Sequence, residues 1–149
     1  MLLYSIPSAY YSTKDSSSLA AFLSQTDVLL AAVPSTPATK HLLSSTTLAH
    51  LKPSALVVNV GRGDLIDTDA LVAALDAKKL AGAILDVTDP EPLPAGHALF
   101  GRKNVIVTPH SSALSVALIG RILEIFATNL ERLKEGKELL NAVGHSSFA

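Results

Sequence analysis

The chain has 149 residues, enough for one ordinary domain with its own core, and 48% of them are hydrophobic against 17% charged, a balance typical of a globular protein. The formal net charge of −1 gives no electrostatic reason to expect nucleic acid or a membrane surface as a partner. The chain has no cysteine, which excludes disulfides, thiolate catalysis and cysteine-bound zinc and is compatible with the cytoplasmic location that we expect.

The first predicted elements are a strand and a helix. Residues 2–6 form an apolar run that is too short for a membrane helix, which needs ~20 residues. No basic residue precedes this run, so a buried strand is favoured over a signal peptide. Asp15 can cap a helix over residues 16–25. Because an apolar strand at a terminus needs a neighbour to pair with, we expect a fold truncated on its N-terminal side.

Further along the chain, predicted strands alternate with predicted helices. Continuous apolar runs predict strands that are covered on both faces, at residues 28–33, 55–60, 83–87 and 105–107. Capping residues and apolar stripes predict helices at residues 45–51, 67–79 and about 113–134. With the first strand included, about five parallel strands are expected. The pattern predicts an α/β fold, a partial doubly wound, Rossmann-like parallel sheet with flanking helices and right-handed crossovers.

Polar side chains follow three of the interior strands. Arg62 comes after the second, Asp86 lies near the end of the third with Glu91 on the loop that follows, and His110 comes after the fourth. Ligands of open parallel sheets bind beyond the carboxyl ends of the strands. A guanidinium, two carboxylates and an imidazole are therefore expected on one rim of the sheet.

Three of these groups match the needs of 2-oxo acid reduction. Arg62 offers paired donors that suit a carboxylate and the adjacent carbonyl oxygen. His110 can deliver a proton near neutral pH, and Glu91 can orient the imidazole and favour its protonated form. Each residue also fits an ordinary structural role: an exposed or helix-capping arginine, a loop histidine, a rigid Pro-Glu-Pro loop. Placement on the rim alone leaves an active site and these structural roles both open.

Other catalytic classes find little support in the chain. The remaining histidines have no metal-binding spacing and no His-Glu-x-x-His pattern occurs, so no metal site is predicted. Ser111 and Ser112 adjoin His110, but a hydrolase triad is disfavoured because no Gly-x-Ser-x-Gly nucleophile elbow is present.

Three segments, in matching order and spacing, resemble the D-isomer-specific 2-hydroxyacid dehydrogenase family. They are Asn59-Val-Gly-Arg-Gly-Asp-Leu-Ile-Asp67, Leu85-Asp-Val-Thr-Asp-Pro-Glu-Pro-Leu-Pro94 and Asn104-Val-Ile-Val-Thr-Pro-His110. The similarity runs from about residue 26 to 143. The second segment is also similar to glyoxylate and hydroxypyruvate reductases.

The resemblance implies a role for each motif residue. Arg62 would bind the substrate carboxylate and carbonyl, and His110 would be the acid–base catalyst with Glu91 as its partner. Asp86 would hold the nicotinamide carboxamide, and Pro34 would line the adenosine side. The implied cofactor-binding residues for NAD or NADP are Val33, Pro34, Val60, Gly61, Arg62, Asp86 and His110.

The resemblance also implies what the chain is and does. Residues 1–135 would be a partial NAD(P)-binding domain and residues 136–149 a C-terminal tail. The activity would be hydride transfer between NAD(P)H and a small 2-oxo or 2-hydroxy acid, with no nucleic acid or membrane as partner and with a homodimer allowed.

Two departures from the family keep an alternative open. The chain lacks the Gly-x-Gly-x-x-Gly turn that grips the cofactor pyrophosphate, and the family's substrate domain is mostly built from sequence before this start. Ser5-Ile-Pro-Ser8 carries no charge, so the sequence indicates no preference between NAD and NADP. The alternative is a truncated, catalytically inactive remnant that acts at most as an interaction or dimerisation domain.

Overall fold

The computed structural model of the chain describes residues 7–142, which divide after Pro109 into two compact units. The predicted strand at residues 2–6 lies outside the described residues. The predicted boundary between domain and tail at residue 135 stays a prediction.

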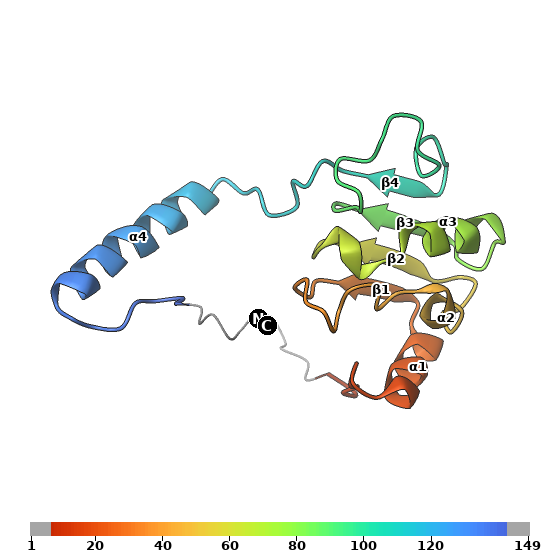
Figure 1. Cartoon of the computed structure of the whole chain (residues 1–149), viewed down its shortest axis with the longest axis horizontal. Coiled ribbons are helices and arrows are strands. Elements are labelled where there is room, and N and C mark those ends of the chain that lie inside the picture. Colours follow the sequence, from red (N-terminus) through yellow and green to blue (C-terminus); the bar gives the residue numbers. More distant parts are fainter. Residues whose placement is uncertain (1–6, 143–149) are drawn as a thin grey trace, which may run out of the picture. The chain divides into compact units, whose positions relative to one another are not determined.

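The first unit is built on one four-stranded parallel sheet (Figure 1). Its strands β1 to β4 lie side by side in chain order and span Val28–Ala31, Leu56–Asn59, Gly82–Leu85 and Val105–Val107. Its helices α1, α2 and α3 span Ser16–Gln25, Ser45–Leu48 and Thr68–Asp76, and the 3-10 turn η1 spans Gly63–Leu65. The predicted α/β class and the four predicted interior strands are confirmed.

Two predicted helices end earlier than the sequence indicated. The helix expected over residues 45–51 is the four-residue α2. The helix expected to reach Lys79 ends at Asp76, because Lys78 adopts the left-handed conformation with a φ of 55°. The Lys79 N–H then donates to the Ala74 carbonyl, which closes the helix end. At the other end of α3, the Asp67 carboxylate accepts the Ala70 N–H at 3.0 Å and so caps the helix.

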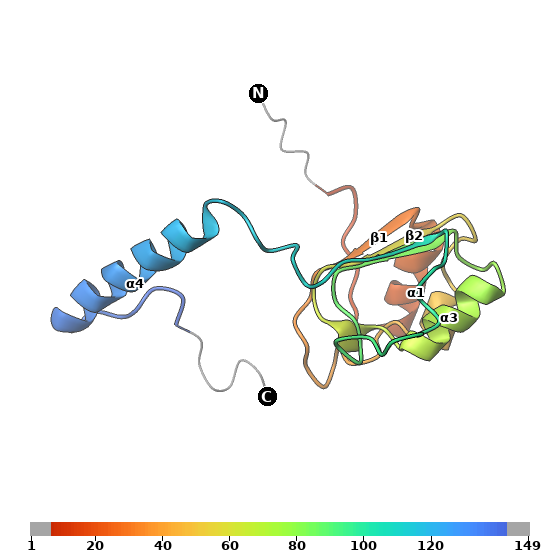
Figure 2. The ribbon, with the colours of Figure 1, turned by 90° about the horizontal axis from the view of Figure 1, so that it is seen from above.

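One face of the sheet carries the core of this unit. Side chains of alternate strand residues and of all three helices form a single buried cluster, which includes Leu19, Leu23, Leu29, Leu48, Val57, Leu71, Leu75 and Leu85. Figure 2 shows α1 and α3 on the same side of the sheet. The opposite face is open in the described unit, with Leu30 62% and Ile106 56% exposed. The three helices of this unit thus pack on one side of the sheet, and the expected cover on the other face stays a prediction.

The second unit is the helix α4 (Leu118–Lys134) with a C-terminal segment folded back on it. The helix begins five residues later than expected from residue 113, after a turn in which the Leu114 N–H donates to the Ser111 carbonyl. Asn129 exchanges two hydrogen bonds with the backbone of Leu140, at 3.1 and 2.7 Å. Across residues 7–142, every helix is too short or too polar to cross a membrane.

A matched pair of leucine substitutions tests which face of the sheet is the core. Leu71 is 1% exposed and packs in the buried cluster, whereas Leu30 on β1 is 62% exposed. We expect Leu71→Ala to lower the free energy of unfolding by about 2–5 kcal/mol, because it leaves a cavity. Leu30→Ala should change it by less than about 0.5 kcal/mol. Urea denaturation followed by circular dichroism measures both, and equal losses would contradict the one-sided core.

Candidate active site

The four strands end at one edge of the sheet. The parallel register pairs Ala31 with Asn59, Asn59 with Leu85, and Leu85 with Val107, so the strands are level at their carboxyl ends. The residues that follow each strand therefore start out side by side. This edge is where open parallel sheets bind their ligands.

A glycine turn after β2 presents Arg62 at this edge. Asn59, the last residue of β2, is completely buried, and its side-chain oxygen accepts the Gly61 N–H at 3.1 Å. Its Nδ2 donates to the Arg62 carbonyl at 2.8 Å. The carboxamide of Asn59 thus fixes the backbone on both sides of the Gly61–Arg62 peptide bond.

Both glycines of this turn lie against neighbouring backbone. A Cβ on Gly61 would come 2.8 Å from the Val33 carbonyl oxygen in the loop after β1. A Cβ on Gly63 would come 2.0 Å from the Thr88 carbonyl oxygen in the loop after β3. The turn therefore packs directly against the backbone of both neighbouring loops, and a side chain at either glycine would have to displace that backbone.

The charge of Arg62 has no carboxylate partner within the described residues. Its exposed guanidinium donates through Nη1 to the carbonyl of Gly61 at 2.8 Å. Arg102, by contrast, donates to the Asp76 carboxylate at 2.8 Å, which lowers the pKa of Asp76 and raises the pKa of Arg102. Arg102 is thus paired within the protein, whereas most donors of Arg62 remain for an anionic ligand.

Glu91 lies on a loop that is tied to the end of β3. The Thr88 N–H donates to Glu91 Oε2 at 3.4 Å, and the Thr88 hydroxyl donates to the Pro90 carbonyl at 3.0 Å. The Thr68 hydroxyl at the start of α3 donates to the Asp89 carbonyl at 2.7 Å. Gly63 also packs on Thr88. The turn at Gly61–Gly63, called the arginine turn below, therefore meets the loop that carries Glu91 at Thr88.

Asp86 is a buried carboxylate, 4% exposed, directly after β3. Its Oδ1 accepts a hydrogen bond from the Thr108 hydroxyl at 2.5 Å, and its N–H donates to the Asn59 carbonyl at 2.9 Å. The Thr108 N–H also donates to the Leu85 carbonyl at 2.9 Å. These bonds link the ends of β2, β3 and β4.

The loop after β1 holds the two candidates for the adenosine side, Val33 and Pro34. The Pro34 carbonyl accepts the Thr39 hydroxyl at 2.7 Å, and the Ser35 hydroxyl donates to Asp64 Oδ2 at 2.6 Å. The second contact joins this loop to η1, just after the arginine turn. Asp64 had no place in the sequence-based site.

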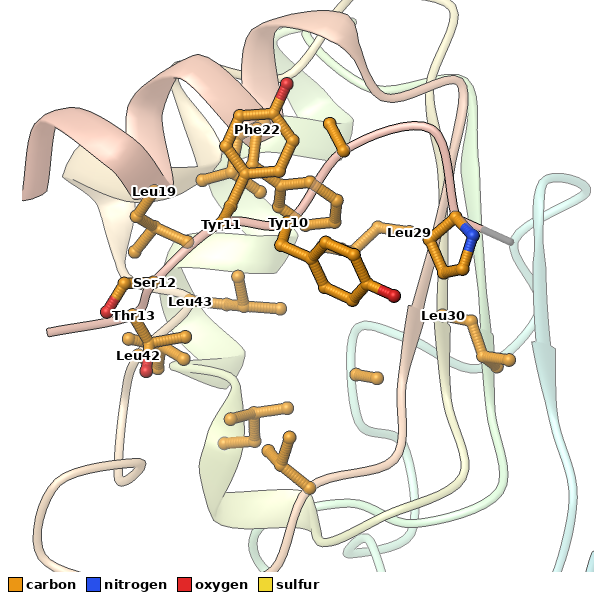
Figure 3. Close-up of a pocket in the computed structure, with 16 residues that line it drawn as sticks. Tyr10, Tyr11, Ser12, Thr13, Leu19, Phe22, Leu29, Leu30, Leu42 and Leu43 are labelled. Carbon is orange, nitrogen blue, oxygen red and sulfur yellow. The ribbon is translucent and has the colours of Figure 1, made fainter. Parts of the chain in front are cut away.

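An apolar cavity of about 390 Å³ lies between α1 and β1. Figure 3 shows Tyr10, Phe22 and Leu29 around it. Val33 is among the residues that line the cavity, whereas Arg62 and Glu91 are not. The polar edge and this cavity are therefore separate features that share the loop after β1.

His110 is the first residue of the second unit. The chain reaches it from the end of β4 through Thr108 and Pro109, and it adopts a left-handed conformation with a φ of 52°. The first unit brings Arg62, Asp86 and Glu91 to one edge. The meeting of His110 with this group remains a prediction.

Sequence reasoning missed two polar residues of this edge. In the sequence, Asn59 falls inside a predicted apolar strand and Thr108 follows another, and neither was given a role in the site. Both immediately flank a strand end, so a wider inspection of polar residues at strand ends would have included them. Over residues 7–142, no three His, Asp or Glu side chains are grouped so that they could hold a metal ion.

An open parallel sheet with polar groups at its carboxyl ends is typical of ligand-binding α/β domains. Residues 5–112 match the family model described as D-isomer specific 2-hydroxyacid dehydrogenase, NAD binding domain. The chain therefore belongs to the D-isomer specific 2-hydroxyacid dehydrogenase family.

Individual relatives agree with this assignment. The chain is 37% identical over 115 residues to a glyoxylate reductase of Thermofilum pendens, covering 77% of this chain and 34% of the relative. A D-isomer specific 2-hydroxyacid dehydrogenase of Xanthobacter autotrophicus, crystallised with NADPH, is similar with a TM-score of 0.82 and 34% identity, over 90% of this chain and 55% of that one. An NADPH-dependent glyoxylate/hydroxypyruvate reductase of Sinorhizobium meliloti, crystallised with NADP and malonate, has a TM-score of 0.76 and 34% identity, over 87% of this chain and 40% of that one. The chain thus spans about a third to half of the length of these relatives.

The packing of the arginine turn can be tested with two glycines. We expect Gly63→Ala to lower the free energy of unfolding by about 1–3 kcal/mol, because the new methyl group must displace backbone of the loop after β3. Gly120 in α4 is the matched control, since a Cβ there meets nothing within 4 Å. Gly120→Ala should be neutral, or stabilise α4 by up to about 1 kcal/mol. Urea denaturation measures both variants, and an equally neutral Gly63→Ala would contradict the close approach.

The bond between Thr108 and Asp86 can be tested with two threonine substitutions. Thr108→Val keeps the shape but removes the hydroxyl that donates to the buried carboxylate. We expect it to lower the free energy of unfolding by about 1.5–3 kcal/mol, the usual range for a hydrogen bond to a charged group. Thr108→Ser retains the donor and should recover most of this loss. Thermal denaturation at neutral pH compares them, and equal stabilities of the valine and serine variants would rule the bond out as a stabilising contact.

Proposed function

We propose that this chain carries the arginine, glutamate and histidine of an NAD(P)-dependent 2-hydroxyacid dehydrogenase. The reaction is hydride transfer between NAD(P)H and a small 2-oxo or 2-hydroxy acid of the glyoxylate or hydroxypyruvate type. The observation that carries the proposal is the state of Arg62. Its guanidinium pairs with no carboxylate among residues 7–142, and a closely packed turn holds its backbone at the ligand-binding edge. The names of the glyoxylate reductase relatives support the substrate class.

Arg62 binds the substrate in this proposal. Two parallel N–H groups of the guanidinium hold the carboxylate, and the positive charge polarises the adjacent carbonyl. To do so, the side chain exchanges its hydrogen bond to the Gly61 carbonyl for one to the substrate. The fixed backbone of the turn limits the reorganisation that this exchange requires.

His110 and Glu91 handle the proton. When the carbonyl carbon accepts a hydride, the carbonyl oxygen gains a negative charge, and His110 donates a proton to it. In the reverse direction the neutral imidazole removes the hydroxyl proton. Glu91 orients the imidazole and stabilises its protonated form. The hydrogen bond from Thr88 to Glu91 supports a defined position of this carboxylate.

The residues at the edge fit a nicotinamide dinucleotide. The bound cofactor supplies or accepts the hydride at its nicotinamide ring. The buried Asp86 carboxylate is an acceptor that suits the carboxamide N–H groups, and the backbone at Val60 and Gly61 follows the neighbouring strand. Val33 and Pro34 offer apolar surface for the adenosine side, next to the apolar cavity that Val33 lines.

A second function is favoured by the open face of the sheet. Leu30 on β1 is 62% exposed and Ile106 on β4 is 56% exposed, and Val28 at the start of β1 is 61% exposed. Both edge strands of the sheet therefore present large aliphatic side chains to solvent. Exposed apolar surface that forms a patch marks an interaction site. The chain would then be a catalytically inactive interaction or dimerisation domain.

A turnover assay separates the two functions. The purified chain is mixed with NADH or NADPH and glyoxylate or hydroxypyruvate, and the absorbance of the reduced nicotinamide is followed. We expect His110→Ala to lower kcat by about 10²–10⁴-fold, the range for loss of a general acid–base group. Arg62→Gln should raise KM for the 2-oxo acid and lower kcat, because both the clamp and the polarising charge are removed.

Arg102→Gln is the matched control, because that arginine is paired with Asp76 and lies outside the proposed site. It should leave KM and kcat within about twofold of the unchanged chain, since exposed ion pairs contribute little. Absence of both turnover and cofactor binding at millimolar concentration would overturn the enzymatic proposal and support the inactive domain.

A further inference from the structure

Asn59 occupies a core position for which its register predicts an aliphatic residue. It is completely buried, and its partners in the neighbouring strands are Ala31 and Leu85. Burial of a carboxamide costs free energy unless its polar atoms are hydrogen-bonded. Packing alone therefore does not explain why an asparagine stands here, so the explanation must lie in its hydrogen bonds.

The carboxamide bonds are directed at the arginine turn and nowhere else among the described residues. The side-chain oxygen accepts the Gly61 N–H at 3.1 Å, and Nδ2 donates to the Arg62 carbonyl at 2.8 Å. The Asn59 side chain thereby bonds the Gly61 N–H and the Arg62 carbonyl, which are the backbone groups on either side of the Gly61–Arg62 peptide bond. An aliphatic replacement would leave both backbone groups unpaired.

A third bond extends this control to the guanidinium. The Gly61 carbonyl, on the peptide between Gly61 and Arg62, accepts a hydrogen bond from Arg62 Nη1 at 2.8 Å. The arginine turn is held on one side by Val33 in the loop after β1 and on the other by Thr88 in the loop after β3. The buried Asn59 side chain holds it from the core. The direction in which the Arg62 side chain leaves the backbone thus depends on the Asn59 carboxamide.

We propose that Asn59 is a positioning residue for Arg62: its buried carboxamide sets the backbone from which the guanidinium reaches an anionic 2-oxo acid. The inference rests on the proposed function for the identity of that ligand. The orientation of Arg62 itself can be measured without any ligand.

The experiment uses the full chain, NMR spectroscopy and the probe oxamate, which carries a carboxylate beside an amide carbonyl. Asn59→Ala removes both carboxamide bonds. Asn104→Ala is the matched control, because Asn104 Nδ2 also donates to a backbone carbonyl, that of Ala81, away from the arginine turn. The readouts are hydrogen exchange of the Gly61 amide, the signal of Arg62 Nε–H, and the affinity for oxamate.

We expect Asn59→Ala to speed exchange of the Gly61 amide by about 5- to 10-fold, the equivalent of one ordinary hydrogen bond. The Arg62 Nε–H signal should move toward that of an unstructured arginine, and oxamate affinity should fall about 10-fold or more through misplacement of the clamp. Asn104→Ala should leave all three unchanged, and it should cost less stability than Asn59→Ala because Asn104 is exposed. A purely structural role for Asn59 would lower stability and leave the Arg62 signal in place, which would overturn the proposal.

The remaining outcomes separate the positioning role from the proposed function. If Asn59→Ala alters the Arg62 signal but the unchanged chain does not bind oxamate, the positioning role stands and the substrate proposal falls. If oxamate binds equally well to both, with the Arg62 signal unaltered, the positioning role falls and the substrate proposal stands. If Asn59→Ala does not fold, Asn59→Ser is measured in its place: a moved Arg62 Nε–H signal supports the proposal, and an unmoved signal overturns it.

Discussion

The candidate site depends on the close approach of backbone at the Gly61–Arg62–Gly63 turn. A side chain on either glycine would collide with a carbonyl, that of Val33 on one side and that of Thr88 on the other. Level strand ends bring these loops together, and the register that levels them is set by the side chains buried under the sheet. The position of one exposed guanidinium is therefore a consequence of core packing several residues away.

The two arginines of the first unit illustrate how context decides the role of a charge. Arg102 is held by Asp76, and the raised pKa of the guanidinium and the lowered pKa of the carboxyl express the same mutual stabilisation. Such a pair joins α3 to the segment before β4 and leaves little charge for a ligand. Arg62 is held through its backbone, so its charge is oriented without being neutralised. Orientation without neutralisation is what a binding group for an anion requires.

The four interior strands could be predicted because short, continuous aliphatic runs between turn residues are typical of parallel sheets. Helix ends were less predictable, since the stop at Lys78 depends on a left-handed backbone conformation that a lysine adopts against its own preference. The open face of the sheet could not be predicted. Leu30 and Ile106 each belong to a continuous apolar run, and such a run looks the same in the sequence whether one or both faces of the strand are covered.

Within the site, Arg62, Asp86 and Glu91 could be chosen by chemistry and strand order, as charged residues that follow strands. Asn59 and Thr108 could not be chosen in this way, because their roles lie in bonds to a backbone carbonyl and to a buried carboxylate. The first bond depends on the path of the turn after β2 and the second on the distance between the ends of β3 and β4, and a single sequence contains neither. Residues that bind ligands are thus easier to predict than residues that hold them in place.

The polar edge and the open apolar face are independent parts of the same sheet. Residues at the edge come after the strands, whereas Leu30 and Ile106 belong to the strands and point to the uncovered side. Covering that face would remove aliphatic surface from water and stabilise the register, and a firmer register would hold the arginine turn more rigidly. Because the face and the edge use different residues, apolar contacts on the face would leave the polar groups at the edge in place.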